Sequence, residues 1–238
     1  WKADVQNCSV LMELYDFFTV SRHGYAARVQ TDWKKILADH RGEGGRVGVL
    51  IRDGQPVLYA LYQRLNTVLR VRELVWREPQ YVDAVWEPLL AWGRSLGAET
   101  LTWDDPAGDP VSALFPESRR EPFLMGRLTD IRSVLATLAY PADLSAEMTL
   151  SLQDPLAPWN EGTYSWSIQR GKGLLRLAPT GAVPDLSLSI GALTQMVFGE
   201  LPARRILAAD GADNCREEHL ELLERMFPPC RNFISEYF

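Results

Sequence analysis

Apolar side chains along this chain repeat with two periods, one typical of helices and one typical of strands. Three segments place an apolar residue at every third or fourth position, which predicts amphipathic helices near residues 10–18, 32–37 and 79–97. Four apolar runs predict strands near residues 47–51, 57–62, 68–76 and 99–103. The order of antiparallel strands, a long helix and one more strand predicts a mixed α/β domain over residues 1–125.

Turn and cap residues set the expected ends of these elements. Asp53-Gly54 is a strong signal for a two-residue hairpin. We expect Asp32 to cap the second helix and Pro79 to begin the long one. Pro88 lies inside the long helix and is expected to kink or restart it, because proline donates no backbone hydrogen bond.

The second half of the chain changes to a period of two. Apolar residues alternate with small polar ones near residues 148–153, 164–168 and 186–190, which predicts a sheet with one buried and one wet face. Helical patterns flank these strands near residues 131–138 and 193–227, with Thr129 or Asp130 as the first cap. We therefore predict a second, α+β domain over residues 126–238, with helices packed on one face of its sheet.

The composition is that of an ordinary globular protein with an acidic balance. Of the 238 residues, 46% are hydrophobic and 24% are charged, and the formal net charge is −6. Because no run is rich in Lys or Arg, this charge argues against a nucleic-acid partner. No apolar stretch approaches the length of a membrane span and no signal peptide is visible, so we expect no membrane partner.

Cysteine and histidine are too sparse and too dispersed for a structural metal site. Cys8, Cys215 and Cys230 are odd in number and far apart, which favours reduced thiols in a cytoplasmic protein over a disulfide framework or a zinc site. The three histidines have no metal-ligand spacing either. We therefore expect no metal cofactor.

A glycine-rich stretch, Arg41-Gly42-Glu43-Gly44-Gly45-Arg46, is a candidate phosphate cradle. Against the Arg/Gln-x-x-Gly-x-Gly/Ala pattern of acetyl-CoA enzymes, Arg41 and Gly44 match, but Arg46 stands where a small residue is needed. A cradle is also followed by a helix, whereas a strand is expected here. We interpret the stretch as a mobile solvent loop.

The layout of the first domain resembles the second half of a GCN5-related N-acetyltransferase (GNAT) domain. In that fold the cofactor loop lies between the central strand and the following helix. Here the junction reads "VLRVRELVWREPQYVDAVWEPLL" and holds no glycine before Gly93. If the fold is GNAT, this copy is therefore expected to be degenerate and unable to bind acetyl-CoA normally.

The whole chain is similar to the carboxy-terminal two-thirds of the enhanced-intracellular-survival (Eis) family of acetyltransferases. The most specific segments are "MTLSLQDPLAPWNEGTYSWSI", "PDLSLSIGALTQMVFGELPARRIL" and the ending "PPCRNFISEYF", which resemble the sterol-carrier-protein-like domain that ends Eis proteins. "FLMGRLTDIRSVL" resembles the connector into that domain, and residues 1–125 resemble the family's central, catalytically silent GNAT domain.

The Eis resemblance implies acetyl transfer from acetyl-CoA to amines, including aminoglycoside-like and polyamine-like acceptors. It implies that acetyl-CoA is bound by an amino-terminal GNAT domain missing from this sequence, that the protein is a homo-oligomer, and that this chain alone is inactive. It also implies that the terminal carboxylate of Phe238 is a catalytic group that helps to accept the amine proton. Tyr237 stands where we would expect an acidic residue, and Glu236 shares the side of Phe238 in an extended tail, so both are candidate substrate contacts.

Three further interpretations stay open. Trp33, which the resemblance makes a candidate for amine binding by a cation–π contact, is equally interpreted as a core residue on the face of Ile36 and Leu37. The second domain is alternatively a lipid carrier, with a tunnel lined by apolar residues, or a scaffold for oligomer assembly. The candidate tunnel residues are Leu174, Leu175, Met196 and Val197.

Overall fold

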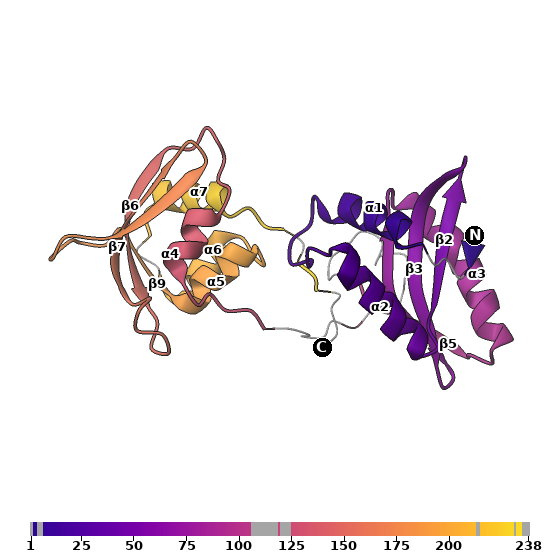
Figure 1. Cartoon of the computed structure of the whole chain (residues 1–238). Helices are drawn as coiled ribbons and strands as arrows, with labels where there is room; N and C mark the ends of the chain where they lie inside the picture. Colours follow the sequence, from indigo (N-terminus) through magenta and orange to yellow (C-terminus); the bar gives the residue numbers. More distant parts are fainter. Residues whose placement is uncertain are drawn as a thin grey trace. The chain divides into compact units, whose positions relative to one another are not determined.

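The computed structural model describes residues 2–3, 7–105, 119, 125–212, 215–230 and 232–234. Its contacts divide the chain into two compact units (Figure 1), each of which is described by itself. The first unit comprises Trp1–Glu121 together with Arg231–Phe238, and the second comprises Pro122–Cys230. The expected domains were 1–125 and 126–238, so the contacts differ chiefly in grouping the last eight residues with the first unit.

The first unit is built on a mixed sheet with the strand order β1-β2-β3-β4-β5. All neighbours in it are antiparallel except β4 and β5, which are parallel. The strands are β1 (Lys2–Ala3), β2 (Arg46–Arg52), β3 (Gln55–Leu65), β4 (Val68–Trp76) and β5 (Thr100–Trp103). The helices are α1 (Cys8–Thr19), α2 (Gln30–Gly42) and α3 (Gln80–Ser95).

Helices cover both faces of this sheet. On one face, Trp33 of α2 packs edge-on against Tyr59 of β3, and α1 lies beside α2 (Figure 1). On the other face, Trp92 of α3 packs against Tyr62 of β3, with ring centroids 4.8 Å apart. This double cover explains why residues 57–63 of β3 are all buried, since a strand buried on both faces needs no polar alternation.

Local signals predicted the hairpin and the order of elements correctly, but the restart of the long helix that Pro88 was expected to cause does not occur. Asp53 and Gly54 both adopt positive φ, as a tight hairpin turn requires. Asp32 is not the residue that precedes α2; it lies in the first turn, and its carboxylate accepts a hydrogen bond from the Val29 N–H at 2.9 Å. Pro88 does not end α3, which runs through it from Gln80 to Ser95.

A buried ion pair lies in the interior of the first unit. The Arg28 guanidinium donates two hydrogen bonds to the Glu73 carboxylate, at 2.9 and 2.6 Å, and the Tyr59 hydroxyl donates a third at 2.6 Å. Burial alone would lower the pKa of Arg28, but the adjacent Glu73 charge raises it above its ordinary value. Burial, and then the Glu73 charge, raise the pKa of Tyr59 well above its ordinary value, so its hydroxyl remains a donor.

The second unit has a four-stranded sheet with the order β8-β7-β6-β9. The strands are β6 (Ala146–Gln153), β7 (Gly162–Gln169), β8 (Lys172–Leu177) and β9 (Leu186–Ser189). The helices are α4 (Ile131–Thr137), α5 (Ile190–Phe198), α6 (Ala203–Asp210) and α7 (Glu217–Met226). Asp130 caps α4, with its carboxylate accepting from the Arg132 and Ser133 N–H groups.

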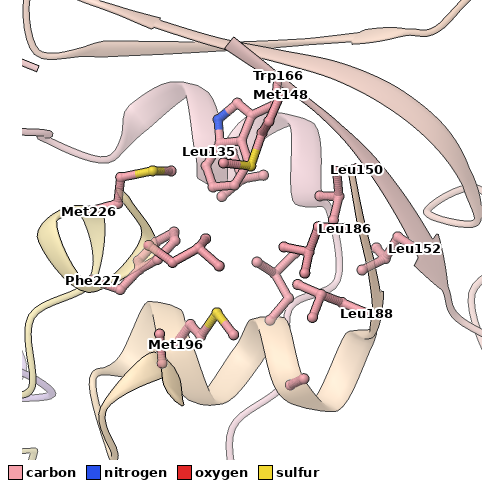
Figure 2. Close-up of a cluster of buried hydrophobic side chains, with 14 of the residues drawn as sticks. Leu135, Met148, Leu150, Leu152, Trp166, Leu186, Leu188, Met196, Met226 and Phe227 are labelled. Atoms are coloured by element: carbon pink, nitrogen blue, oxygen red, sulfur yellow. The ribbon is translucent and has the colours of Figure 1, made fainter. Parts of the chain in front are cut away.

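The predicted period-two pattern of this sheet is confirmed. Every second residue of β6 and β7 is buried, and the helices lie against that face alone (Figure 1). Figure 2 shows the resulting core, in which sheet residues such as Leu150 and Trp166 face Met196 of α5 and Phe227 after α7. The mixed α/β architecture predicted from the sequence, with helices on one face of the second sheet, is therefore confirmed.

The glycine-rich stretch at 41–46 is a tight turn between α2 and β2, not a loose loop. Gly44 has φ +81°, and the Gly45 N–H donates to the His40 carbonyl at 2.8 Å. The His40 ring is fully buried against Gly45, and its Nε2 lies 3.0 Å from the Arg46 carbonyl oxygen. Burial lowers the pKa of His40, which keeps the ring neutral at pH 7. A Cβ on Gly45 would lie only 2.4 Å from that ring.

Two further findings concern the described residues. None of their helices is both long and apolar enough to cross a bilayer. The three cysteines are free thiols, and all are partly buried.

We expect Gly45→Ala to destabilise the first unit by about 1–3 kcal/mol, because the new methyl group overpacks the buried His40 ring. Gly42→Ala is the matched control. A Cβ on Gly42 meets no atom within 4 Å, and alanine is the better helix former, so this variant should be neutral or slightly more stable. Urea denaturation measures both; equal stabilities would contradict the packing explanation.

We expect Glu73→Gln to destabilise the first unit by about 3–5 kcal/mol, because it removes the charge that balances the buried Arg28. Tyr59→Phe removes one hydrogen bond to the same carboxylate and should cost about 1–2 kcal/mol. The double variant Arg28→Leu/Glu73→Leu should lose less than the sum of the two single replacements. Additive losses in denaturation curves would show that the pair is not coupled.

Candidate functional site

Ligands of open α/β sheets bind outside the carboxyl ends of parallel strands, beside the helix that follows one of them. In the first unit, β4 and β5 are the parallel pair and α3 follows β4. Their pairing begins at Val68 with Thr100 and ends at Val71 with Trp103, so β4 continues to Trp76 without β5 and is paired there with β3. We call this position, between Trp76, Trp103 and the start of α3, the strand-end site.

Three indole rings meet at the strand-end site. Trp76 is the last residue of β4 and Trp103 the last of β5, and their ring centroids lie 6.1 Å apart. Trp86 of α3 packs on Trp103 at 5.8 Å, and Phe18 of α1 packs on Trp76 at 4.7 Å. The Arg22 guanidinium lies 3.6 Å from the centre of the Phe18 ring. Bulky side chains therefore fill the position in which a cofactor of this unit would be expected.

A carboxylate of the chain itself, that of Glu78, lies at the start of α3. Glu78 precedes the helix, accepts a hydrogen bond from the Gln80 amide at 2.9 Å and lies 3.5 Å from the Tyr81 hydroxyl. Pro79, at the cap position, has no N–H to offer. Helix N-termini favour negative charge, and here a carboxylate of the chain already provides it.

These residues do not fit the pyrophosphate of acetyl-CoA. The glycine-rich turn packs on a buried histidine and leads into a strand, while the junction before α3 has an acidic residue, a proline and no glycine. Free backbone N–H groups at a helix start are what a phosphate needs. The first unit therefore has the sheet order that suits a ligand site but not the groups that would hold this cofactor.

Trp33, the predicted amine contact, lies in the core. Its exposed fraction is 0%, and it packs edge-on against Tyr15 at 5.5 Å and Tyr59 at 5.9 Å. A cation does lie over its ring, but that cation is the chain's own Arg28, at 4.8 Å from the ring centre. This environment agrees with the core alternative rather than with an exposed indole.

The other predicted site residues, Glu236, Tyr237 and Phe238, lie outside the described residues. What precedes them is described: Asn232 forms a parallel bridge with His23, and the Phe233 N–H donates to the His23 carbonyl at 3.1 Å. The segment that leads to the chain end therefore belongs to the first unit, in agreement with the grouping of contacts. Sequence patterns gave no sign of this pairing.

The candidate lipid tunnel is not supported by the positions of its residues. Leu174 and Leu175 lie on opposite faces of β8, with exposed fractions of 44% and 7%. Met196 is fully buried among the core side chains of Figure 2, which converge from the sheet and the helices. The four proposed residues thus do not line one space.

Sequence analysis missed the Arg28–Glu73–Tyr59 cluster, although one signal was present. Glu73 is a charged residue within the apolar run 68–76, and a charge buried in a strand requires a partner. Among the described residues no group of three or more His, Cys, Asp or Glu side chains is arranged to hold a metal ion. Asp104, which follows β5, forms an ion pair with Arg70 at 2.6 Å.

Family models match both halves of the chain. Residues 24–132 match the acetyltransferase (GNAT) domain, and residues 131–235 match the sterol carrier protein domain. None of the curated proteins matches the chain at a significant level.

Solved structures with the same fold cover nearly the whole chain. A GCN5-related N-acetyltransferase from Anabaena variabilis ATCC 29413 is 21% identical over 100% of this chain, with a TM-score of 0.71. A probable N-acyltransferase from Enterococcus faecalis V583 is 16% identical over 100%, with a TM-score of 0.81. Eis1 from Mycobacterium abscessus is 20% identical over 98%, with a TM-score of 0.59.

This chain spans only 62%, 62% and 60% of the lengths of those three proteins, respectively. At such identities the likeness establishes the fold and not the activity. Together with the two family matches, it shows that the chain combines a GNAT acetyltransferase domain with a sterol carrier protein domain.

Proposed function

We propose that this chain is the acceptor-shaping part of an acetyl-CoA-dependent N-acetyltransferase that acts on amines. The observation that carries the proposal is the filled strand-end site: a GNAT domain whose own cofactor position holds Trp76, Trp86 and Trp103. In this proposal acetyl-CoA is bound by a separate, amino-terminal GNAT domain of the same polypeptide. The greater length of the matching structures supports that arrangement.

The proposed acceptor is a cationic amine of the aminoglycoside or polyamine type. The Eis-like ending of the chain and the net charge of −6 support a cationic acceptor. A terminal carboxylate has a reference pKa of about 3.3–3.7, so that of Phe238 is anionic at neutral pH. It holds the ammonium of the substrate and accepts its proton as the nitrogen becomes nucleophilic. Glu236 and Tyr237 precede it in the sequence and are the proposed substrate contacts.

We expect this chain alone to show no binding of acetyl-CoA by titration calorimetry, because the strand-end site is filled and lacks free N–H donors. A protein that includes the amino-terminal domain is the positive control and should bind. Micromolar affinity of the present chain, equivalent to about 8 kcal/mol, would contradict the proposal, since it requires a site that we describe as absent.

We expect a single glycine added after Phe238 to lower turnover of the longer protein on the order of a hundredfold, since acid–base groups typically contribute that much. The addition moves the carboxylate by up to about 3.6 Å and keeps every side chain. Phe238→Leu is the matched control, because it changes the side chain and keeps the carboxylate in place. Near-normal turnover of the extended protein, with an unchanged melting temperature, would rule out the catalytic role.

A further inference from the structure

The loop between α1 and α2 receives the returning end of the chain. The chain leaves the first unit after Glu121, forms the second unit and rejoins the first at Arg231. Asn232 then pairs in parallel with His23, and the Phe233 N–H donates to the His23 carbonyl at 3.1 Å. The described part of this ending lies beside the loop (Figure 1, yellow).

Aromatic side chains fix this contact to the core. The Phe233 ring packs against Tyr25 with centroids 5.8 Å apart. Tyr25 in turn packs edge-on against Phe18 at 5.7 Å and Tyr15 at 6.2 Å, both of which are buried. Arg22 holds the start of the loop, because its guanidinium donates to the Phe18 carbonyl at 2.9 Å. The surface that receives Phe233 is therefore supported by packed side chains rather than by a free loop.

Gly24 provides the space for this contact. It has φ +81°, a conformation that side chains with a Cβ rarely adopt. A Cβ at this position would also lie 3.1 Å from both the backbone N and the backbone O of Phe233. Any other residue would thus press on the backbone of the returning segment at the point where it is hydrogen-bonded.

We infer that His23, Gly24 and Tyr25 form a socket that positions the carboxy-terminal segment, with Gly24 as its positioning residue. Docking is a property of this chain by itself. Its consequence for catalysis rests on the function proposed above for the Phe238 carboxylate.

The test compares two glycines that share one backbone conformation. Gly24 and Gly44 both have φ +81°, but a Cβ on Gly44 meets no atom within 4 Å. Gly24→Ala and Gly44→Ala therefore introduce the same kind of backbone strain, and only the first obstructs the tail. Hydrogen exchange of the peptide that spans residues 228–238 reports docking directly, since the Phe233 N–H is hydrogen-bonded only in the docked state.

We expect Gly24→Ala to speed exchange of this peptide by about tenfold or more, and Gly44→Ala to leave it unchanged. Equal exchange in the two variants overturns the socket. If Gly24→Ala fails to fold, Phe233→Ser replaces it, because this change removes the Tyr25 ring contact from the side of the tail. Unchanged exchange in Phe233→Ser overturns the socket in the same way.

The catalytic consequence has a separate readout in the longer protein. With Gly24→Ala, kcat should fall while the KM for acetyl-CoA stays at its normal value, and Gly44→Ala should change neither. Faster exchange with normal turnover leaves the socket established and overturns its catalytic consequence, and with it the proposed role of the carboxylate. The failure of the socket and the failure of the proposed function are thus distinguishable.

Discussion

The buried pair of Arg28 and Glu73 is the interaction on which the first unit depends. The Arg28 guanidinium lies over Tyr15 at 4.2 Å and over Trp33 at 4.8 Å, and Glu73 accepts from Tyr59, so the pair joins α1, α2, β3 and β4. Two opposite charges buried away from water stabilise the fold only as a pair, because the loss of either one leaves the other buried and uncompensated. Arg28 also ends the loop that carries the socket, and the pair therefore fixes one end of that loop to the sheet.

The aromatic residues of the strand-end site continue into the socket. Successive ring contacts lead from Trp86 through Trp103, Trp76, Phe18 and Tyr25 to Phe233, with centroid distances between 4.7 and 6.1 Å. Each such pair contributes about 0.5–1.5 kcal/mol beyond the area that it buries. The side chains that occupy the strand-end site thus also support the segment that contains Phe233. One aromatic cluster serves both places.

Local sequence patterns predicted the features that depend only on neighbouring residues, namely turns and the alternation of buried and exposed positions. The hairpin at Asp53-Gly54 follows from backbone conformation alone, and the alternation in β6 and β7 follows from one buried sheet face. The helix does not restart at Pro88, because packing of α3 on the sheet outweighs one missing hydrogen bond. Glu73 and Arg28 are 45 residues apart, and Phe233 lies more than two hundred residues from His23. No periodicity contains such pairings, which is why the helical pattern around Trp33 left an amine contact and a core position equally open and gave no sign of Arg28 over its ring.

The second unit has an interior filled by its own side chains, with Met196, Met226 and Phe227 packed between sheet and helices. Two segments flank this core along the chain: the one before Leu128 and the one after Phe227. The first is held inside the unit, because Arg127 pairs with the buried carboxylate of Asp154, which also accepts from Asn160 at 2.9 Å. The second leads directly to the socket. On the proposed function, the pairing of Asn232 and Phe233 with the loop at His23 matters for catalysis, since a carboxylate at the end of an unsupported chain would be spread over many positions and could not serve one amine.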